Sequence, residues 1–248
     1  EVGLAASLGL TSLKVFRKLR VAIISTGDEL FEPGVPLVTG GIYDSNRYSL
    51  LALIDSLGCE VTDLGILPDS KSAIRETLNS AALNHDAIIT SAGVSVGDED
   101  HLRSAVLDLG HLHFWKLAIK PGRPVAFGQI GRTAFIGLPG NPVAMMITFL
   151  LIARPALLKL SGAIDVLPRL YKVQSGFDYK KKLFRREYVR VSLTVDNTGE
   201  LVANKFPRDG AGILSSLVES EGIIELPEEI TQLKKGEMVK FLPFRGVS

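Results

Sequence analysis

The chain has 248 residues, of which 46% are apolar and 22% are charged, and its formal net charge is +1. This composition is typical of a globular protein and excludes intrinsic disorder, while the near-neutral charge argues against general nucleic-acid binding. A single cysteine, Cys59, excludes a disulfide framework and a cysteine-rich zinc site.

No signal-peptide pattern and no uninterrupted apolar run of roughly 18–20 residues is found, so we expect a cytoplasmic chain that does not span a membrane. The first residue is Glu1 rather than Met. We therefore expect either a processed chain or the C-terminal part of something longer.

Residues 20–163 alternate short apolar runs with segments of helical period. The predicted strands are 20–25, 60–67, 86–91, 111–118, 124–130 and 133–136, and the predicted helices are 45–57, 70–84, 99–109 and 142–160. Strands that alternate with helices form a mostly parallel sheet covered on both faces. The sequence thus predicts a three-layer α/β domain over residues 20–163.

Residues 168–248 lack the helical period and hold short alternating stretches separated by turn signals such as residues 196–199. This pattern predicts a small all-β domain. We expect residues 1–19 to be a linker from a preceding element. The basic cluster at residues 180–186 has little aromatic content, so a solvated hairpin tip is favoured over an RNA-binding surface.

Four polar or glycine-rich segments follow predicted strands of the α/β domain, at residues 25–29, 68–70, 93–100 and 137–142. Ligands of open α/β sheets bind beyond the carboxyl ends of the strands. The convergence of the four segments at one edge therefore predicts a binding site there.

Residues 93–97 match the G-x-S-x-G pattern of hydrolase nucleophiles. A hydrolase with this pattern needs a histidine well downstream of the serine. No histidine follows His113, which disfavours Ser95 as a nucleophile. A phosphate or pterin cradle is favoured, with backbone N–H groups and a helix N-terminus facing an anion. A plain tight turn capped by Asp98 remains the alternative.

Acidic residues gather at the same edge. Oxygen ligands without cysteine or clustered histidine suit Mg²⁺, although some of these acids also suit a helix N-terminus. The acids are Asp28, Glu29, Asp69, Asp98 and Asp100. His111 and His113 share a strand face, but two histidines without a third ligand do not favour a metal site.

Lys116, Lys120 and Arg123 are three of the ten basic residues within 21–167, where fifteen residues are acidic. An even spacing places both lysines on one face of an extended strand. Pro121 and Pro124 stiffen this turn, and a fixed cationic turn suits an oxyanion. An ordinary charged turn is the alternative.

Residues 139–142, Pro-Gly-Asn-Pro, predict a helix start with Asn141 as N-cap and Pro142 in the first turn. Such a start also presents backbone N–H groups to a ligand.

At these positions the chain resembles the MoeA/gephyrin family of molybdopterin molybdenumtransferases. The shared segments are STGDEL (25–30), IYDSN (42–46), SAGVSVGDED (91–100), KLAIKPGRP (116–124), GLPGNPV (137–143), RREYVRV (185–191) and GILSSL (212–217). The resemblance implies a MogA-like α/β domain at 20–163 and a C-terminal β-barrel domain at 168–248. It also implies an N-terminal part that this chain lacks.

The family's reaction takes adenylylated molybdopterin and molybdate, cleaves the adenylate with Mg²⁺ and releases AMP and molybdenum cofactor. The resemblance implies a homodimer whose partner closes the cleft, so we expect poor activity from this chain alone. It also implies transient contact with a MogA-type adenylyltransferase and with molybdoenzymes.

The resemblance also assigns residues. Catalytic roles fall on Glu29, Asp69, Asp100, Lys116 and Lys120, of which the three acids would hold Mg²⁺. Substrate-binding roles fall on Thr26, Gly27, Asp28, Asp44, Asn46, Gly93, Ser95, Gly97, Asp98, Arg123, Pro139, Gly140, Asn141, Pro142 and Arg190. Many members have serine where this chain has Ala144 and Ala211, and either hydroxyl would help to bind molybdate.

Two other functions are alternatives. A MogA-type adenylyltransferase shares the α/β domain, but it has a T-G-G-T-G-type loop where this chain has residues 92–97, and it lacks a barrel. A gephyrin-like scaffold without enzymatic activity is the other alternative, although the chain shows no long disordered linker.

Overall fold

The computed structural model describes residues 1–91 and 101–244. Its larger sheet has the strand order β4-β1-β5-β9-β8-β6. The strands are β1 (Arg20–Thr26), β4 (Glu60–Leu67), β5 (Ala87–Ser91), β6 (Gly110–Lys116), β8 (Pro124–Ile130) and β9 (Thr133–Leu138). Strands β4, β1, β5 and β9 are parallel, and β8 is antiparallel to both of its neighbours. The predicted mostly parallel sheet is confirmed.

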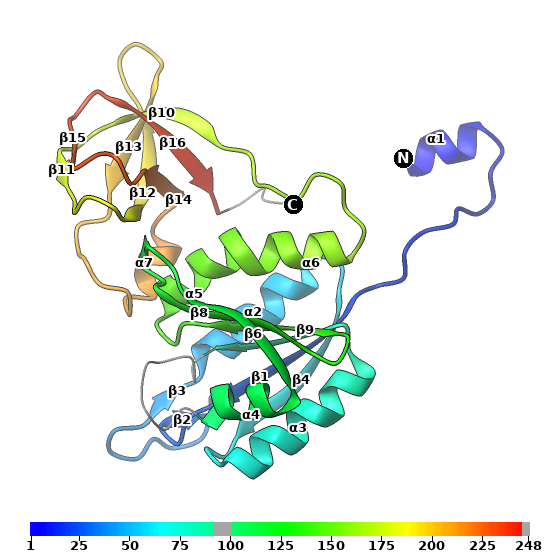
Figure 1. The fold of residues 1–248 in the computed structure, drawn as a ribbon. Helices are drawn as coiled ribbons and strands as arrows, with labels where there is room; N and C mark the ends of the chain where they lie inside the picture. The colour runs from blue at the N-terminus through cyan, green and yellow to red at the C-terminus, as the bar shows by residue number, and fades with distance from the viewer. Residues whose placement is uncertain (92–100, 245–248) are drawn as a thin grey trace.

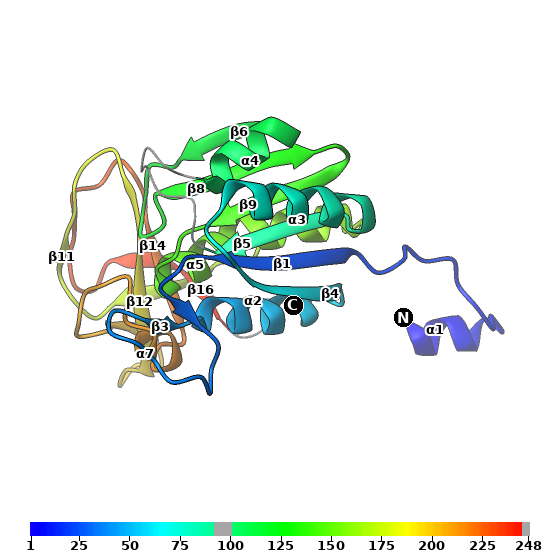
Figure 2. The ribbon, with the colours of Figure 1, turned by 90° about the horizontal axis from the view of Figure 1, so that it is seen from below.

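Helices cover both faces of this sheet, as Figure 2 shows for α2 on one side and α3 and α4 on the other. Their bounds are α2 (Ser45–Asp55), α3 (Lys71–Asn84) and α4 (His101–Leu109). In β1, Val21 and Ile23 pack against the α2 side, and Ala22 and Ile24 pack against the α3 and α4 side. Because both faces of the strand are apolar, the sheet requires a helical layer on each side.

The predicted helix 142–160 consists of three consecutive segments, α5 (Pro142–Thr148), η1 (Phe149–Ala153) and α6 (Arg154–Leu160). Segment η1 is π-helical and directly precedes α6, in which Pro155 has no N–H to donate. Within the described residues this is the one helix long and apolar enough to cross a membrane, and 56% of its most apolar window is buried inside the protein. Its apolar side chains belong to the core on the α2 side of the sheet.

The second sheet is a barrel of β10 (Tyr171–Ser175), β12 (Arg186–Val195), β13 (Leu201–Lys205), β14 (Gly222–Leu226) and β16 (Met238–Pro243). It closes because β12 pairs with β13 as well as with β14. Its core contains Val173, Val191 and Ile224. The predicted small β-barrel is confirmed. Strand β1 runs toward the barrel in Figure 2, so the barrel lies on the side of the carboxyl edge of the larger sheet.

Short elements complete the fold. They are α1 (Val2–Ser7), β2 (Leu30–Phe31), β3 (Ile42–Tyr43), β7 (Ile119–Lys120), β11 (Tyr179–Lys180), β15 (Gln232–Leu233) and α7 (Ser215–Val218). Helix α1 projects away from the rest of the chain in Figures 1 and 2, which agrees with the expected linker at residues 1–19. The boundaries 1–19, 20–163 and 168–248 stay a prediction.

Strand β7 joins the two sheets. The sequence predicted one strand over 111–118, but β6 ends at Lys116 because the Leu117 N–H donates to the Arg123 carbonyl at 2.8 Å and closes a turn. The chain then pairs β7 with β12 of the barrel, Lys120 opposite Glu187, and Arg186 N donates to Ala118 O at 3.0 Å. The loop after β6 is therefore held by the barrel.

Candidate functional site

The carboxyl ends of the three central strands lie side by side. Ser25 of β1 is opposite Ser91 of β5, and Ser91 is opposite Leu138 of β9. The residues that follow these strands therefore start at one edge, as predicted. Gly93, Ser95, Gly97, Asp98 and Asp100 lie outside the described residues, and their roles stay predictions.

The turn after β1 positions Glu29. Thr26 is buried at the end of β1, and Asp28 and Glu29 are exposed. Gly27 has a φ of +138°, and a Cβ there would come within 2.6 Å of Glu29 Oε2. The backbone conformation therefore favours glycine, and a side chain at this position would displace the carboxylate of the exposed Glu29.

Asp69 is exposed and directly precedes Ser70, whose hydroxyl caps α3 by accepting from Ala73 N at 3.3 Å. Among residues 1–91 and 101–244, no three His, Cys, Asp or Glu side chains gather closely enough to hold a metal ion. The three-acid site of Glu29, Asp69 and Asp100 stays a prediction.

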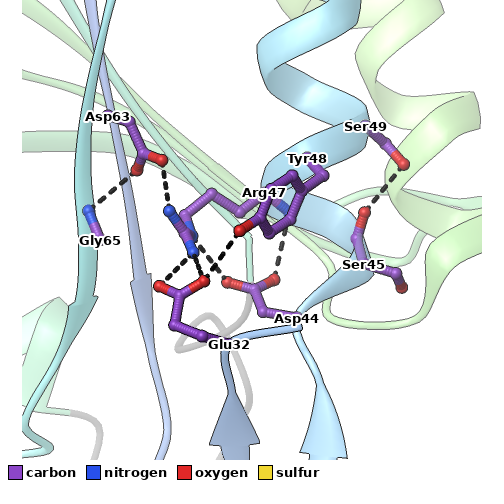
Figure 3. A network of polar contacts seen from close by, with 8 residues as sticks. All are labelled: Glu32, Asp44, Ser45, Arg47, Tyr48, Ser49, Asp63 and Gly65. Carbon is purple, nitrogen blue, oxygen red and sulfur yellow. Dashed lines mark hydrogen bonds and ion pairs between the residues drawn. The ribbon is translucent and has the colours of Figure 1, made fainter. Parts of the chain in front are cut away.

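A buried ion-pair network lies beside this edge (Figure 3). Arg47 is 2% exposed and bonds to Asp44, Asp63 and Glu32. Asp44 also caps α2 by accepting from Arg47 N at 3.1 Å. Burial lowers the pKa of Arg47, but hydrogen bonds from its guanidinium to Asp63 and Asp44 outweigh burial and raise the pKa overall. Both Asp44 oxygens accept from Arg47, so the structure gives this predicted binding residue a structural role.

Asn46 links α2 to the loop after β9. Its Nδ2 donates to the Gly140 carbonyl at 2.6 Å, while its buried Oδ1 has no hydrogen-bond partner among the residues that the structure describes. The buried Ser25 Oγ and Thr90 Oγ1, near the ends of β1 and β5, also have no partner in the described part of the chain. Buried polar atoms are normally hydrogen-bonded. Three such atoms near one sheet edge fit a site for a polar ligand.

The loop of Pro139 and Gly140 leads into α5 with Pro142 in its first turn, as predicted. Asn141 is at the N-cap position, but its side chain makes no capping hydrogen bond. The sequence suggested that the N–H groups at this helix start would be free. In the structure the Val143 N–H donates to the Ala211 carbonyl of the barrel at 3.0 Å. The start of α5 is thus docked against the barrel.

A small pocket of about 170 Å³ lies where β7 meets the barrel. Lys120 of β7 and Arg190 of β12 both line it, from two strands that are neighbours in the second sheet but far apart along the chain. Its other charged or ionisable lining residues are Glu187, Lys205, Asp209, Tyr179 and Tyr188, and Ala211 also contributes to its wall. The pocket therefore brings together the predicted cations of the turn and of the barrel.

Glu187 is 2% exposed and interacts with three neighbours in this pocket. Its carboxylate accepts from Arg185 at 2.6 Å and from the Tyr179 hydroxyl at 3.0 Å, and it lies 3.5 Å from Lys120 Nζ. Burial alone raises the pKa of Glu187, but the Arg185 and Tyr179 hydrogen bonds and the Lys120 charge lower it overall. Sequence reasoning missed this residue. The alternation of β12 could have identified it. Glu187 lies on the same side of the strand as Val189 and Val191, which belong to the barrel core, and a carboxylate at a core-facing position is unusual.

Arg190 is 9% exposed and has no carboxylate within ion-pair distance among the described residues. Its Nη1 donates to Ser216 Oγ, and its guanidinium lies 5.4 Å from the centre of the Phe206 ring. Burial lowers the pKa of Arg190 from its usual range, with Asp209 acting weakly in the other direction. A buried cation beside Lys120 makes this pocket suitable for an anion.

The other predicted cations do not lie at the pocket of Lys120 and Arg190. Lys116 and Arg123 are exposed and do not line the pocket. The expectation that Lys116 and Lys120 share one strand face is wrong, because the chain turns between β6 and β7. The interpretation of residues 180–186 as a solvated tip is also wrong for Arg185 and Arg186, which pair with Glu187 and with Glu225 and Glu228.

The three-layer α/β domain and the appended β-barrel define the architectural class of the protein. Residues 22–159 match the family described as "Probable molybdopterin binding domain", and residues 172–244 match the "MoeA C-terminal region (domain IV)". The chain belongs to the molybdopterin-binding domain family, in the MoeA arrangement with that C-terminal region.

Similar proteins agree with this assignment. A molybdopterin molybdenumtransferase of Haemophilus influenzae is 38% identical to this chain, and the match covers 97% of this chain and 60% of the relative. A molybdopterin molybdenumtransferase of a Nostoc species is 35% identical, and the match covers 98% of this chain and 57% of the relative. A molybdopterin biosynthesis MoeA protein of Pyrococcus horikoshii superposes with a TM-score of 0.82 at 30% identity, covering 98% of this chain and 59% of that one. The chain thus spans about 60% of the length of the relatives it matches.

Proposed function

We propose that this chain carries the molybdenum-insertion site of a molybdopterin molybdenumtransferase. The observation that supports this most directly is the pocket that Lys120 of β7 and Arg190 of β12 line together. Three cations against two carboxylates give the pocket a net positive wall, which suits an oxyanion such as molybdate, and a pocket of about 170 Å³ is small enough to enclose it closely.

The pterin substrate is proposed to lie at the neighbouring sheet edge. Asn46, Ser25 and Thr90 have buried polar atoms without partners there, which a polar heterocycle would satisfy. The Val143–Ala211 hydrogen bond holds that edge against the barrel, so the pterin and the oxyanion would lie near each other. Lys120 and Arg190 would hold the oxyanion and stabilise the charge that develops as the adenylate leaves as AMP.

A magnesium requirement is part of this proposal. Glu29 and Asp69 offer two exposed carboxylates, and Asp100 would offer the third. Oxygen donors of this kind suit Mg²⁺, and the ion would neutralise charge on the adenylate phosphate when bound.

Assembly and location are also proposed. We infer a cytoplasmic homodimer in which the part that the longer relatives possess closes the cleft of the partner. Closure excludes water and strengthens the electrostatic interactions between the charged groups in the site. The 248-residue chain alone is then expected to bind molybdate but to turn over slowly. Transient contact with a MogA-type adenylyltransferase and with molybdoenzymes would supply the substrate and accept the product.

The test is a single-turnover assay with the chain in excess over adenylylated molybdopterin, measuring AMP release with and without molybdate and Mg²⁺. The Haemophilus influenzae relative is run at equal concentration. Molybdate-dependent AMP release that is slower in the chain than in the relative supports the proposal. Adenylylation of free molybdopterin from ATP would instead show an adenylyltransferase. If the chain neither releases AMP nor binds molybdate, the result would favour a scaffold without enzymatic activity.

A further inference from the structure

Among residues 1–91 and 101–244, Arg154 is a buried cation that no carboxylate pairs with. It is 6% exposed and lies at the start of α6, far along the chain from the residues of the proposed site. Its Nη1 makes one long hydrogen bond, 3.4 Å to the Val166 carbonyl, and its buried Nε has no partner. No ion pair joins Arg154 to any other residue in the described ranges.

An unpaired guanidinium in this position is unfavourable. Desolvation destabilises a buried charge, and burial is the only influence that shifts the pKa of Arg154, which it lowers. Buried charges in proteins are usually paired or bound to a ligand. The position of Arg154 therefore points to an anion that is supplied from outside the described chain.

A cavity of about 540 Å³ lies beside this guanidinium. Its wall is formed by Arg154, by Ser56 at the end of α2, by Asp165 and Arg169 of the segment that joins α6 to β10, and by Pro243 of β16. The volume is within the range of small-molecule sites. The cavity thus contacts the α/β unit, the connecting segment and the barrel.

The charges of the wall favour an anion. Arg154 and Arg169 contribute two positive charges, and Asp165 contributes one negative charge. Asp165 is exposed and forms no ion pair with either arginine. A net positive wall with the unpartnered Nε of Arg154 offers an oxyanion both charge and a hydrogen bond, whereas the Ser56 hydroxyl already donates to the Leu53 carbonyl at 2.7 Å.

We propose that this cavity is an oxyanion-binding site, distinct from the Lys120–Arg190 pocket, in which Arg154 and Arg169 hold a phosphate or carboxylate group. The bound group compensates the buried charge of Arg154. It also connects α6, the connecting segment and the barrel, and thereby fixes the segment between the two sheets.

The test uses inorganic phosphate and acetate as probes at constant ionic strength, in a Lys120→Ala background that weakens the other proposed oxyanion site. The melting temperature is expected to rise saturably with phosphate. In Arg154→Met the rise is lost, and without phosphate this variant melts no lower than its parent because an uncompensated buried charge has been removed. The matched control, Arg132→Met, changes an exposed arginine in the β8–β9 turn and keeps the rise.

A second measurement needs no substitution at Arg154. Trypsin is expected to cut after the exposed Arg169, and phosphate is expected to slow this cut without slowing cleavage after Arg132. A stronger effect of acetate than of phosphate would assign the site to carboxylates. The proposal is overturned if neither anion protects Arg169, or if Arg154→Met responds to phosphate as its parent does. These outcomes do not depend on molybdate binding at Lys120.

Discussion

Glu187 and Lys120 lie opposite each other in the two-residue strand pair that joins the sheets, with 3.5 Å between Glu187 Oε2 and Lys120 Nζ. The two side chains differ in exposure, at 2% for Glu187 and 53% for Lys120. The carboxylate is fixed inside the barrel by Arg185 and Tyr179, while the ammonium extends from it toward solvent. Glu187 is thus placed to hold Lys120 at the mouth of the pocket.

We expect Lys120→Ala to weaken molybdate binding by about 1.5–3 kcal/mol, the usual value of a charge-assisted hydrogen bond. This corresponds to a roughly ten- to hundredfold higher Kd. Stability should change little, because the lysine is half exposed. Isothermal titration with molybdate and a thermal melt measure the two effects. Lys172→Ala, an exposed lysine of β10, is the control, and equal affinity in both variants would contradict the assignment.

We expect Glu187→Gln to act through Lys120. The amide keeps the shape but loses the charge, so the protein should lose about 1.5–3 kcal/mol of stability at neutral pH. The folded pKa of Glu187 is lower than its ordinary value of 4.5, so its carboxylate stabilises the fold above that pH and less as pH falls. The stability difference between the parent and the variant should therefore shrink below about pH 4.5.

Urea unfolding at several pH values measures this difference. Molybdate affinity in Glu187→Gln should also fall, since Lys120 is no longer held. Glu225→Gln is the control because it removes a carboxylate that pairs with Arg186 outside the pocket. A stability difference that does not depend on pH, with unchanged molybdate affinity, would show that Glu187 does not position Lys120.

We expect Ala211→Ser to tighten molybdate binding. Ala211 lines the pocket, so a hydroxyl there adds a donor worth about 0.5–1.5 kcal/mol. Ala144 is 3% exposed on α5 and does not line the pocket. Ala144→Ser should therefore leave the affinity unchanged and lower the melting temperature by burying a hydroxyl. A tighter Kd in the Ala144 variant alone would reverse this assignment.

We expect Arg47→Met to destabilise the protein by about 3–5 kcal/mol, because it leaves the buried carboxylate of Asp44 without a counter-charge. Denaturant unfolding measures the loss. Combining it with Asp44→Ser should recover part of the stability, since serine keeps the helix cap and removes the buried charge. A double variant no more stable than Arg47→Met would show that the network matters for another reason.

We expect Gly27→Ala to reduce Mg²⁺-dependent AMP release beyond its effect on stability, because the new methyl group displaces the Glu29 carboxylate. Gly34→Ala is the matched control. Gly34 also has a positive φ, of +94°, but nothing lies within 4 Å of its Cβ position. Both variants should therefore be strained, and only Gly27→Ala should lose activity in single-turnover assays. Equal activity of the two variants would show that the Glu29 carboxylate takes no part in the reaction.

Local patterns in the sequence determined most of the α/β fold. The β-branched apolar run of β1 is buried on both faces, which is why a two-sided sheet was predicted correctly. Ser70 and Pro142 marked helix starts because their chemistry suits those positions without any tertiary contact. The prediction that the motifs at the strand ends start at one edge of the sheet is confirmed for β1, β5 and β9, whose ends lie side by side.

Only the tertiary structure decided which charges meet. The chain turns after Lys116, and β7 pairs with a strand of the barrel, so Lys120 joins Arg190 while Lys116 does not. The role of Glu187 and the unpaired state of Arg154 were equally hidden from the sequence. Periodicity reports the face on which a residue lies within its own element. The partner of a buried charge depends on long-range packing between elements, which local sequence does not encode.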